Sequence, residues 1–314
     1  MTHHRVVRAL QKCALLSIVL VGLTETRLVA EEPASSRPVE NRDPGAQYRL
    51  ARQYAKGDGV PRDPVKATEL LRQSAEQGYA AAQTDLAAAY ANGSGVQQNY
   101  PEAARWYRKA AEQGDALAQY TFGRVCLTGR GMPKDVKEAV KWLKLAAEQD
   151  QPDAMLALGD LYLNGAEGMK PDFEQAFRWF SKAVEKGRLA GLNSLGFLYE
   201  HGAGVPTSLT HAVECFRDAA EKGDARGQMN LGRMYLEGQG IEKDAVEAYK
   251  WFNLALRNGE LVARHYLFEM QTHEELSENQ VAAAEQKVRD YLKARQPHSP
   301  SGSESRVHPA EAAR

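Results

Sequence analysis

Cysteine is scarce in this sequence, and the short motifs that mark most enzymes are missing. Only three cysteines occur among 314 residues, so disulfides do not organise the chain. There is no His-Glu-x-x-His zinc motif, no Gly-x-Ser-x-Gly nucleophile motif and no phosphate-binding loop. Histidines such as His201 and His265 are scattered and lack the spacing of metal ligands. We predict a protein that is not an enzyme and has no cofactor and no metal site.

An excess of charge of one sign is also absent. Forty basic and forty-one acidic residues give a net charge of −1, whereas a nucleic-acid binder usually presents a basic face. The composition, 43% hydrophobic and 26% charged, is that of an ordinary soluble protein. We therefore predict no nucleic-acid partner.

Long hydrophobic runs are lacking except near the N-terminus. The run Cys13–Leu23 follows several basic residues and precedes Leu28-Val29-Ala30, which offers a small residue for cleavage. This pattern predicts a signal peptide over residues 1–30 and an exported protein, periplasmic or secreted. A membrane span needs about 20 apolar residues, so we expect no stable span after cleavage; an uncleaved signal anchor is the alternative.

The rest of the chain is one unit repeated six times. The segment Ala103–Gly114 returns with small changes at Ala67, Ala139, Ala176, Ala212 and Ala248. Four columns of positions keep a step of 36 residues, with one step of 37. A small-residue column contains Ala51, Ala87, Gly123, Gly159, Gly196 and Gly232. An aromatic column three residues later contains Tyr54, Tyr90, Cys126, Tyr162, Tyr199 and Tyr235. A loop-glycine column contains Gly57, Gly93, Gly129, Gly165, Gly202 and Gly238. A tryptophan column contains Leu70, Trp106, Trp142, Trp179, Cys215 and Trp251. Repetition at such a period is typical of a solenoid, in which each unit buries its apolar face against its neighbours.

Each unit contains two stretches with apolar residues at helical spacing, separated by a glycine-containing turn. We call them helix A and helix B. Helix B is predicted to begin at a capping residue in every unit, namely Asp63, Asn99, Asp135, Asp172, Ser208 and Asp244. Four units add a Glu or Gln three residues later, which predicts a reciprocal capping box with Glu102, Glu138, Gln175 and Glu247. Helix B is expected to end at a glycine in every unit except the third, where Asp150 stands instead.

The columns also predict the core. Small residues let helix A approach helix B closely, and the tryptophans and tyrosines fill the remaining volume. Replacing a fully buried tryptophan of the column by alanine is expected to cost about 3–5 kcal/mol. Cys126 and Cys215 replace core aromatics in different helices of different units, so we expect two inert thiols that do not pair.

The motif Ala154–Gly165, followed by Asp172, Ala176 and Trp179, resembles the Sel-1-like repeat, a relative of the tetratricopeptide repeat. The resemblance implies an all-α, right-handed α-solenoid of antiparallel helix pairs that holds other proteins together. We expect a flexible leader over residues 31–45, six repeats over 46–259, C-terminal capping helices over 260–295 and a disordered tail over 296–314. Some exported relatives carry a disulfide in each repeat and bind penicillin; this chain lacks those cysteines and any Ser-x-x-Lys motif.

Function is therefore expected on the concave surface of the A helices, at positions that vary from unit to unit. The candidate partner-binding residues are Arg52, Asp85, Arg124, Asp160, Asn193, Phe197, Asn230 and Arg233. Arginines would grip carboxylates, asparagines would bond a peptide backbone, and Phe197 would anchor an apolar side chain. We predict an exported scaffold that binds a protein or an extended peptide, with the oligomeric state open. The alternatives are a periplasmic regulator of a membrane sensor kinase and a weak penicillin-binding or β-lactamase-like enzyme.

Overall fold

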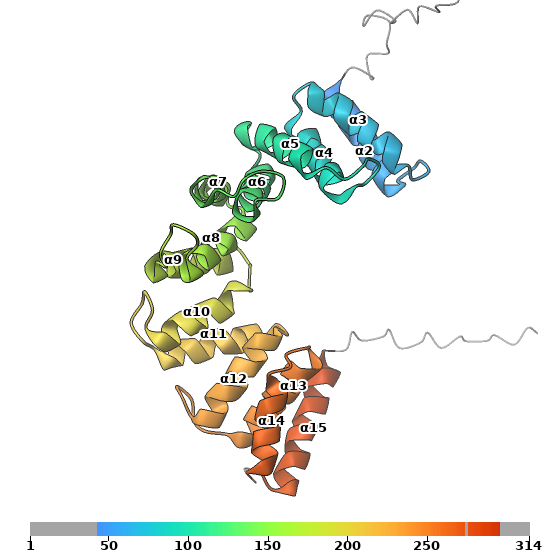
Figure 1. Cartoon of the computed structure of the whole chain (residues 1–314). Coiled ribbons are helices and arrows are strands. Elements are labelled where there is room, and N and C mark those ends of the chain that lie inside the picture. Colours follow the sequence, from blue (N-terminus) through green and yellow to red (C-terminus); the bar gives the residue numbers. More distant parts are fainter. Residues whose placement is uncertain (1–42, 274–275, 296–314) are drawn as a thin grey trace, which may run out of the picture. The chain divides into compact units, whose positions relative to one another are not determined.

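The structure, a computed structural model, describes residues 43–273 and 276–295, and within these ranges the chain is helical throughout (Figure 1). The predicted signal peptide, the tail and most of the leader lie outside the described residues. The described chain divides into two compact units after Tyr79. The first contains α2 (Pro44–Lys56) and α3 (Pro64–Glu76). The second contains α4 (Ala80–Asn92), α5 (Tyr100–Glu112), α6 (Ala116–Thr128), α7 (Val136–Glu148), α8 (Pro152–Asn164), α9 (Phe173–Glu185), α10 (Gly191–His201), α11 (Leu209–Glu221), α12 (Ala225–Glu237), α13 (Ala245–Arg257), α14 (Ala263–Thr272) and α15 (Glu278–Ala294).

The helices alternate as the repeat predicts. From α2 to α13 the even-numbered helices are A helices and the odd-numbered ones are B helices, and each A helix packs on the B helix that follows it. In the second compact unit, each B helix from α5 to α11 also packs on the next A helix. An all-α repeat fold follows, in which each helix pair of the second compact unit shields the apolar face of its neighbour.

The first helix begins earlier than the predicted leader boundary. Asp43 caps α2 by accepting hydrogen bonds from the amides of Gly45 and Ala46, at 3.1 and 2.9 Å. Pro44 occupies the first helical turn, where proline is well tolerated because its missing N–H would have no helical partner. Residues 44 and 45 therefore belong to the first repeat, although proline content had suggested a leader.

The capping residues of helix B are confirmed in all six units, but the predicted capping box is wrong. Asn99 and Asp135, for example, accept hydrogen bonds from the amides of Glu102 and Glu138 at 3.1 and 2.9 Å. The return bond does not form, because the amide of the capping residue already donates to the aromatic-column carbonyl, as Asp135 does to Cys126 at 2.9 Å. The same backbone bond recurs in every unit and fixes the turn between helix A and helix B. The glutamates are consequently free to pair with other side chains.

The glycines of the small-residue column leave space for phenylalanine rings and not for the tryptophans. A Cβ built on Gly159, Gly196 or Gly232 would lie 2.5–2.9 Å from a ring carbon of Phe180, Phe216 or Phe252. Each of these rings follows the tryptophan column by one residue, is at most 1% exposed, and fills the space that the glycine leaves. Trp106, Trp142 and Trp251 are also buried, whereas Trp179 is half-buried. In the third to sixth repeats the residue of helix B that faces the small-residue column is therefore the one after the tryptophan column, namely Leu143, Phe180, Phe216 and Phe252.

A side-chain hydrogen bond between a buried glutamine of helix A and an exposed amide at the end of helix B ties the two helices of four repeats together. The amide of Gln113, at the end of helix B, donates to the side-chain oxygen of Gln83 on helix A at 2.7 Å. Gln77 to Gln47, Gln149 to Gln119 and Asn258 to Gln228 repeat this bond at 2.7, 2.8 and 2.9 Å. In the other two repeats Met155 and Leu192 replace the glutamine of helix A, and lysines replace its partner. The two positions change together because an unpaired buried amide would be destabilising.

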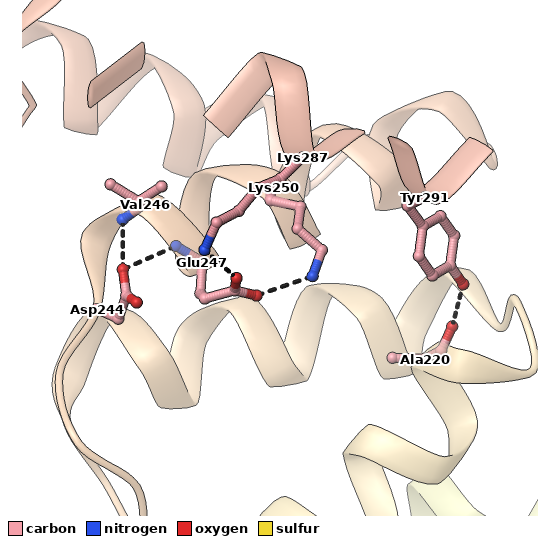
Figure 2. Close-up of polar contacts among 7 residues, drawn as sticks. All are labelled: Ala220, Asp244, Val246, Glu247, Lys250, Lys287 and Tyr291. Carbon is pink, nitrogen blue, oxygen red and sulfur yellow. Dashed lines mark hydrogen bonds and ion pairs between the residues drawn. The ribbon is translucent and has the colours of Figure 1, made fainter. Parts of the chain in front are cut away.

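Two further helices follow the sixth repeat. Phe268 of α14 stands where every preceding A helix has Ala or Gly, and it is 60% exposed, so a ring occupies the position that close packing of a further helix B would need. Instead α15 packs on α13 and reaches back to the end of α11 (Figure 2). Lys287 pairs with Glu247 at 2.5 Å, and the Tyr291 hydroxyl donates to the Ala220 carbonyl at 3.1 Å.

Candidate functional site

The eight predicted partner-binding residues do not form one site. Arg233 is only 19% exposed at its side chain and forms ion pairs with Glu200 and Glu237 at 2.8 and 3.3 Å. Burial alone would lower its pKa, but the hydrogen bond and the charge of Glu200 hold the pKa of the guanidinium above its ordinary value. The donors of Arg233 are thus engaged within the protein, which argues against the predicted role of gripping a partner's carboxylate.

Asn193 also has a structural partner. Its side-chain nitrogen donates to the carboxylate of Asp224, which in turn accepts from the amide of Gly227 and caps α12. Because a carboxylate only accepts hydrogen bonds, the amide oxygen of Asn193 must point away from it, and this buried oxygen has no partner among the described residues. Asn193 joins α10 to the first turn of α12 and positions that turn.

The remaining predicted residues are spread over other A helices. Arg52 and Arg124 are exposed, and each guanidinium lies over a tyrosine ring of its own helix, at 5.8 and 5.7 Å. Asp85 is half-buried on α4. Asp160 reaches solvent from α8, and partial desolvation raises the pKa of its carboxyl. None of these four residues lies in the groove where three of the others meet.

That groove follows one face of α10 and has a volume of about 590 Å³. We call it the α10 groove. It brings together three of the predicted residues, Asn193, Phe197 and Asn230. Its remaining lining residues are Leu163, Asn164, Phe173, Ser194, His201, Ala203 and Arg226. All of them belong to the second compact unit, on α8 to α12 and the connections between them.

The two ends of the groove differ in chemistry. Arg226 lies near the N-terminal end of α10, where the Asn193–Asp224 bond holds the first turn of α12, and Asn230 follows one helical turn later on α12. The side chains of Arg226 and Asn230 make no hydrogen bond or ion pair with another described residue. This end therefore offers hydrogen-bond donors and one positive charge.

The C-terminal end of α10 carries aromatic and apolar surface. Phe197 and Phe173 are 43% and 41% exposed, which is unusual for large apolar rings in this chain, where most are buried. The His201 ring stacks on Phe197 with 4.3 Å between the ring centres. Its Nδ1 lies 3.0 Å from the Phe197 carbonyl, and because a carbonyl only accepts, this nitrogen carries the proton. The other ring nitrogen is left for a ligand.

Sequence reasoning missed Arg226, His201 and Phe173. Arg226 precedes Asn230 by four residues, and His201 follows Phe197 by four, so helical spacing on the same face gives a signal for both. Phe173 belongs to the start of a B helix, and its place beside an A-helix face depends on how consecutive repeats pack. No sequence pattern in the chain indicates that contact.

Within residues 43–273 and 276–295, no three His, Cys, Asp or Glu side chains gather to hold a metal ion. None of the described helices has the length and apolarity to cross a membrane. Cys126 and Cys215 are free thiols, as predicted, and burial raises their pKa values to about 12 and about 11. Both thiols are therefore protonated and unreactive at neutral pH.

These helix pairs, with their recurrent caps and an exposed groove, define a helical repeat protein of the solenoid class. A family model described as the Sel1 repeat matches residues 44–79, 80–115, 116–151, 152–187, 189–224 and 225–260. The chain belongs to the Sel1 repeat family, which confirms the resemblance drawn from its sequence.

Two solved structures are similar to it. One is a protective antigen present in uropathogenic Escherichia coli strains, with 32% identity and a TM-score of 0.71; the match covers 80% of this chain and 54% of that one. The chain thus spans about half the length of that antigen. The other is a Sel1 repeat protein from Oxalobacter formigenes, with 30% identity and a TM-score of 0.66 over 81% of this chain and 99% of that one. No curated protein matches the chain.

Proposed function

We propose that this protein is a non-catalytic scaffold that works outside the cytoplasm and binds a partner protein through the exposed face of its A helices. The Sel1 repeat fold is generally used for protein interaction. The observation that carries the proposal is the α10 groove, where an exposed ring lies together with an arginine and an asparagine whose side chains have no hydrogen-bond partner among residues 43–273 and 276–295. A surface with an apolar anchor and a few convergent polar groups is what a binding site requires.

Export is supported by the N-terminal pattern of basic residues, an apolar run and Ala30. It is tested by fractionating cells that produce the full chain, and by sequencing the N-terminus of the mature product. A cleaved protein outside the cytoplasm is expected. A full-length protein in the cytoplasmic fraction would refute this part of the proposal.

Binding is tested by in-cell crosslinking and affinity purification of the full chain. The groove variant Phe197→Ala/Asn230→Ala is compared with Phe268→Ala, which removes an even more exposed ring on α14, 60% against 43% for Phe197. We expect a partner that is recovered with the wild type and with Phe268→Ala but lost with the groove variant, while all three proteins melt alike. Recovery that is unaffected by the groove variant would contradict the proposed surface.

A further inference from the structure

We propose that the α10 groove binds an extended peptide segment of its partner in which an acidic residue lies three or four positions from a large aromatic or apolar residue. The inference rests on the proposed function and adds to it the chemistry of the bound segment. Three features of the groove support the inference: its charge, its apolar end and the distance between its two ends.

The charge of the groove favours an anionic segment. Its lining contains the exposed Arg226, and no lining residue is acidic. The carboxylates nearest in sequence are already engaged. Glu200 pairs with Arg233 and Glu174 pairs with Arg178. Asp224 bonds Asn193 and the first turn of α12, and Asp172 caps α9. A carboxylate is therefore the group that the unpaired guanidinium of Arg226 best complements, because two parallel N–H donors fit its two oxygens.

The other end of the groove favours a large apolar side chain. Phe197, Phe173 and Leu163 line it together with Ala203, and no charged residue of α8 or α9 lines it. Phe197 and Phe173 are 43% and 41% exposed to solvent, so a side chain that covers them removes apolar surface from water. An aromatic side chain fits best, because offset stacking on exposed rings adds to simple burial.

The spacing follows from the geometry of α10. Asn193 and His201 mark the two ends of the groove on this helix and are eight residues apart. At a rise of about 1.5 Å per residue they are separated by about 12 Å along the helix axis. An extended chain advances about 3.3 Å per residue, so three or four peptide residues cover this distance. The Asn193–Asp224 bond holds the first turn of α12, and with it Arg226, beside the N-terminal end of α10.

The test uses synthetic peptides and the full chain. A fluorescein-labelled Gly-Ser-Glu-Gly-Ser-Phe-Gly-Ser peptide is titrated with the protein and followed by fluorescence anisotropy. Peptides with Lys in place of Glu, or with Ala in place of Phe, serve as comparisons. We expect each change to weaken binding about tenfold or more, as the loss of a charge-assisted hydrogen bond or of a buried ring does.

Charge reversal tests Arg226 directly. Arg226→Glu is expected to weaken the Glu peptide about tenfold or more and to strengthen the Lys peptide. Arg264→Glu, an exposed arginine on α14 outside the groove, makes the same change in net charge and is expected to leave both affinities unaltered.

Three results would overturn the inference: equal binding of the Glu and Lys peptides, no effect of Arg226→Glu, or no binding of any peptide at millimolar protein. In each case the crosslinking experiment still reports on the proposed function. A partner that remains sensitive to Phe197→Ala/Asn230→Ala would show that the groove binds a surface of different chemistry. Loss of that sensitivity as well would refute the proposed function.

Discussion

Replacing Gly196 by alanine tests the packing of helix A on helix B. The new Cβ would lie 2.5 Å from Cε1 and 2.8 Å from both Cδ1 and Cζ of the Phe216 ring. Real Cβ atoms essentially never approach so closely, and Phe216 is 1% exposed, so its ring has no free space to enter. Overpacking of this kind costs about 1–3 kcal/mol. Alanine gains about 1 kcal/mol in helix propensity over glycine, which leaves a net destabilisation of about 0–2 kcal/mol. We expect a value toward the upper end of this range, because three ring atoms of Phe216 would lie under 3.0 Å from the new Cβ.

The assay is urea unfolding followed by far-ultraviolet circular dichroism, with Ser194→Ala on the same helix as a control. Ser194 faces the groove, so its replacement reports helix propensity without the clash. The second arm is Phe216→Leu, because the first repeat pairs Ala51 with leucine at the equivalent position of helix B, Leu71. In the Phe216→Leu protein, Gly196→Ala is expected to destabilise the fold by at least about 1 kcal/mol less than in the wild type. A coupling of this size is typical of residues in contact. A Gly196→Ala protein as stable as the wild type would refute the reasoning.

The remaining predictions concern a turn, the tryptophan column and the C-terminal helix. Asp150 is the only described residue other than glycine with positive φ (60°), so Asp150→Gly should stabilise the protein by about 1 kcal/mol, seen as a higher urea midpoint. Trp142→Ala should cost about 3–5 kcal/mol and Trp179→Ala clearly less, because Trp142 is 8% exposed and Trp179 is half-buried; equal shifts in melting temperature would contradict this. Burial favours protonation of Glu247, but hydrogen bonds from its lysine partners, Lys287 among them, lower the pKa of its carboxyl overall. The ionised Glu247 therefore stabilises the folded protein above the unfolded pKa of about 4.3, and this contribution is lost as the pH falls through the lower folded pKa. Glu247→Gln should remove this part of the pH dependence, which is measured as the free energy of unfolding at a series of pH values.

The repeat itself could be predicted because it is local. The period, the capping residues and the glycine ends depend on neighbours within a few positions. The capping residue occurs in all six units and the terminal glycine in five, so chance patterns are averaged out. Asp150 is an example of such a local feature. The sequence shows it at the position where the other repeats have the terminal glycine, and in the structure Asp150 adopts the left-handed conformation. The prediction of a capping box was wrong for a local reason as well. The backbone amide of the capping residue, which the box requires, donates instead to a carbonyl of the preceding helix.

The position of the innermost core residue could not be predicted with the same certainty. Trp179 and Phe180 are adjacent, both are large and apolar, and both recur with the repeat period. Periodicity fixes the spacing of a column but leaves open which of two neighbouring columns faces the small residue. That choice depends on the rotation of helix B about its own axis, and the contact of Phe180 with Gly159 decides it.

The sequence by itself determined the helix pairs, their caps and their family, because these features arise from short-range hydrogen bonds and a repeated pattern. Only the tertiary structure decided which exposed residues meet. Leu163, Phe197 and Arg226 come from three different A helices, and they share a groove because consecutive repeats pack against one another. In the same way, Tyr291 meets a carbonyl 71 residues earlier. Contacts between residues so far apart along the chain leave no periodic signal, and the folded packing of the helices alone creates them.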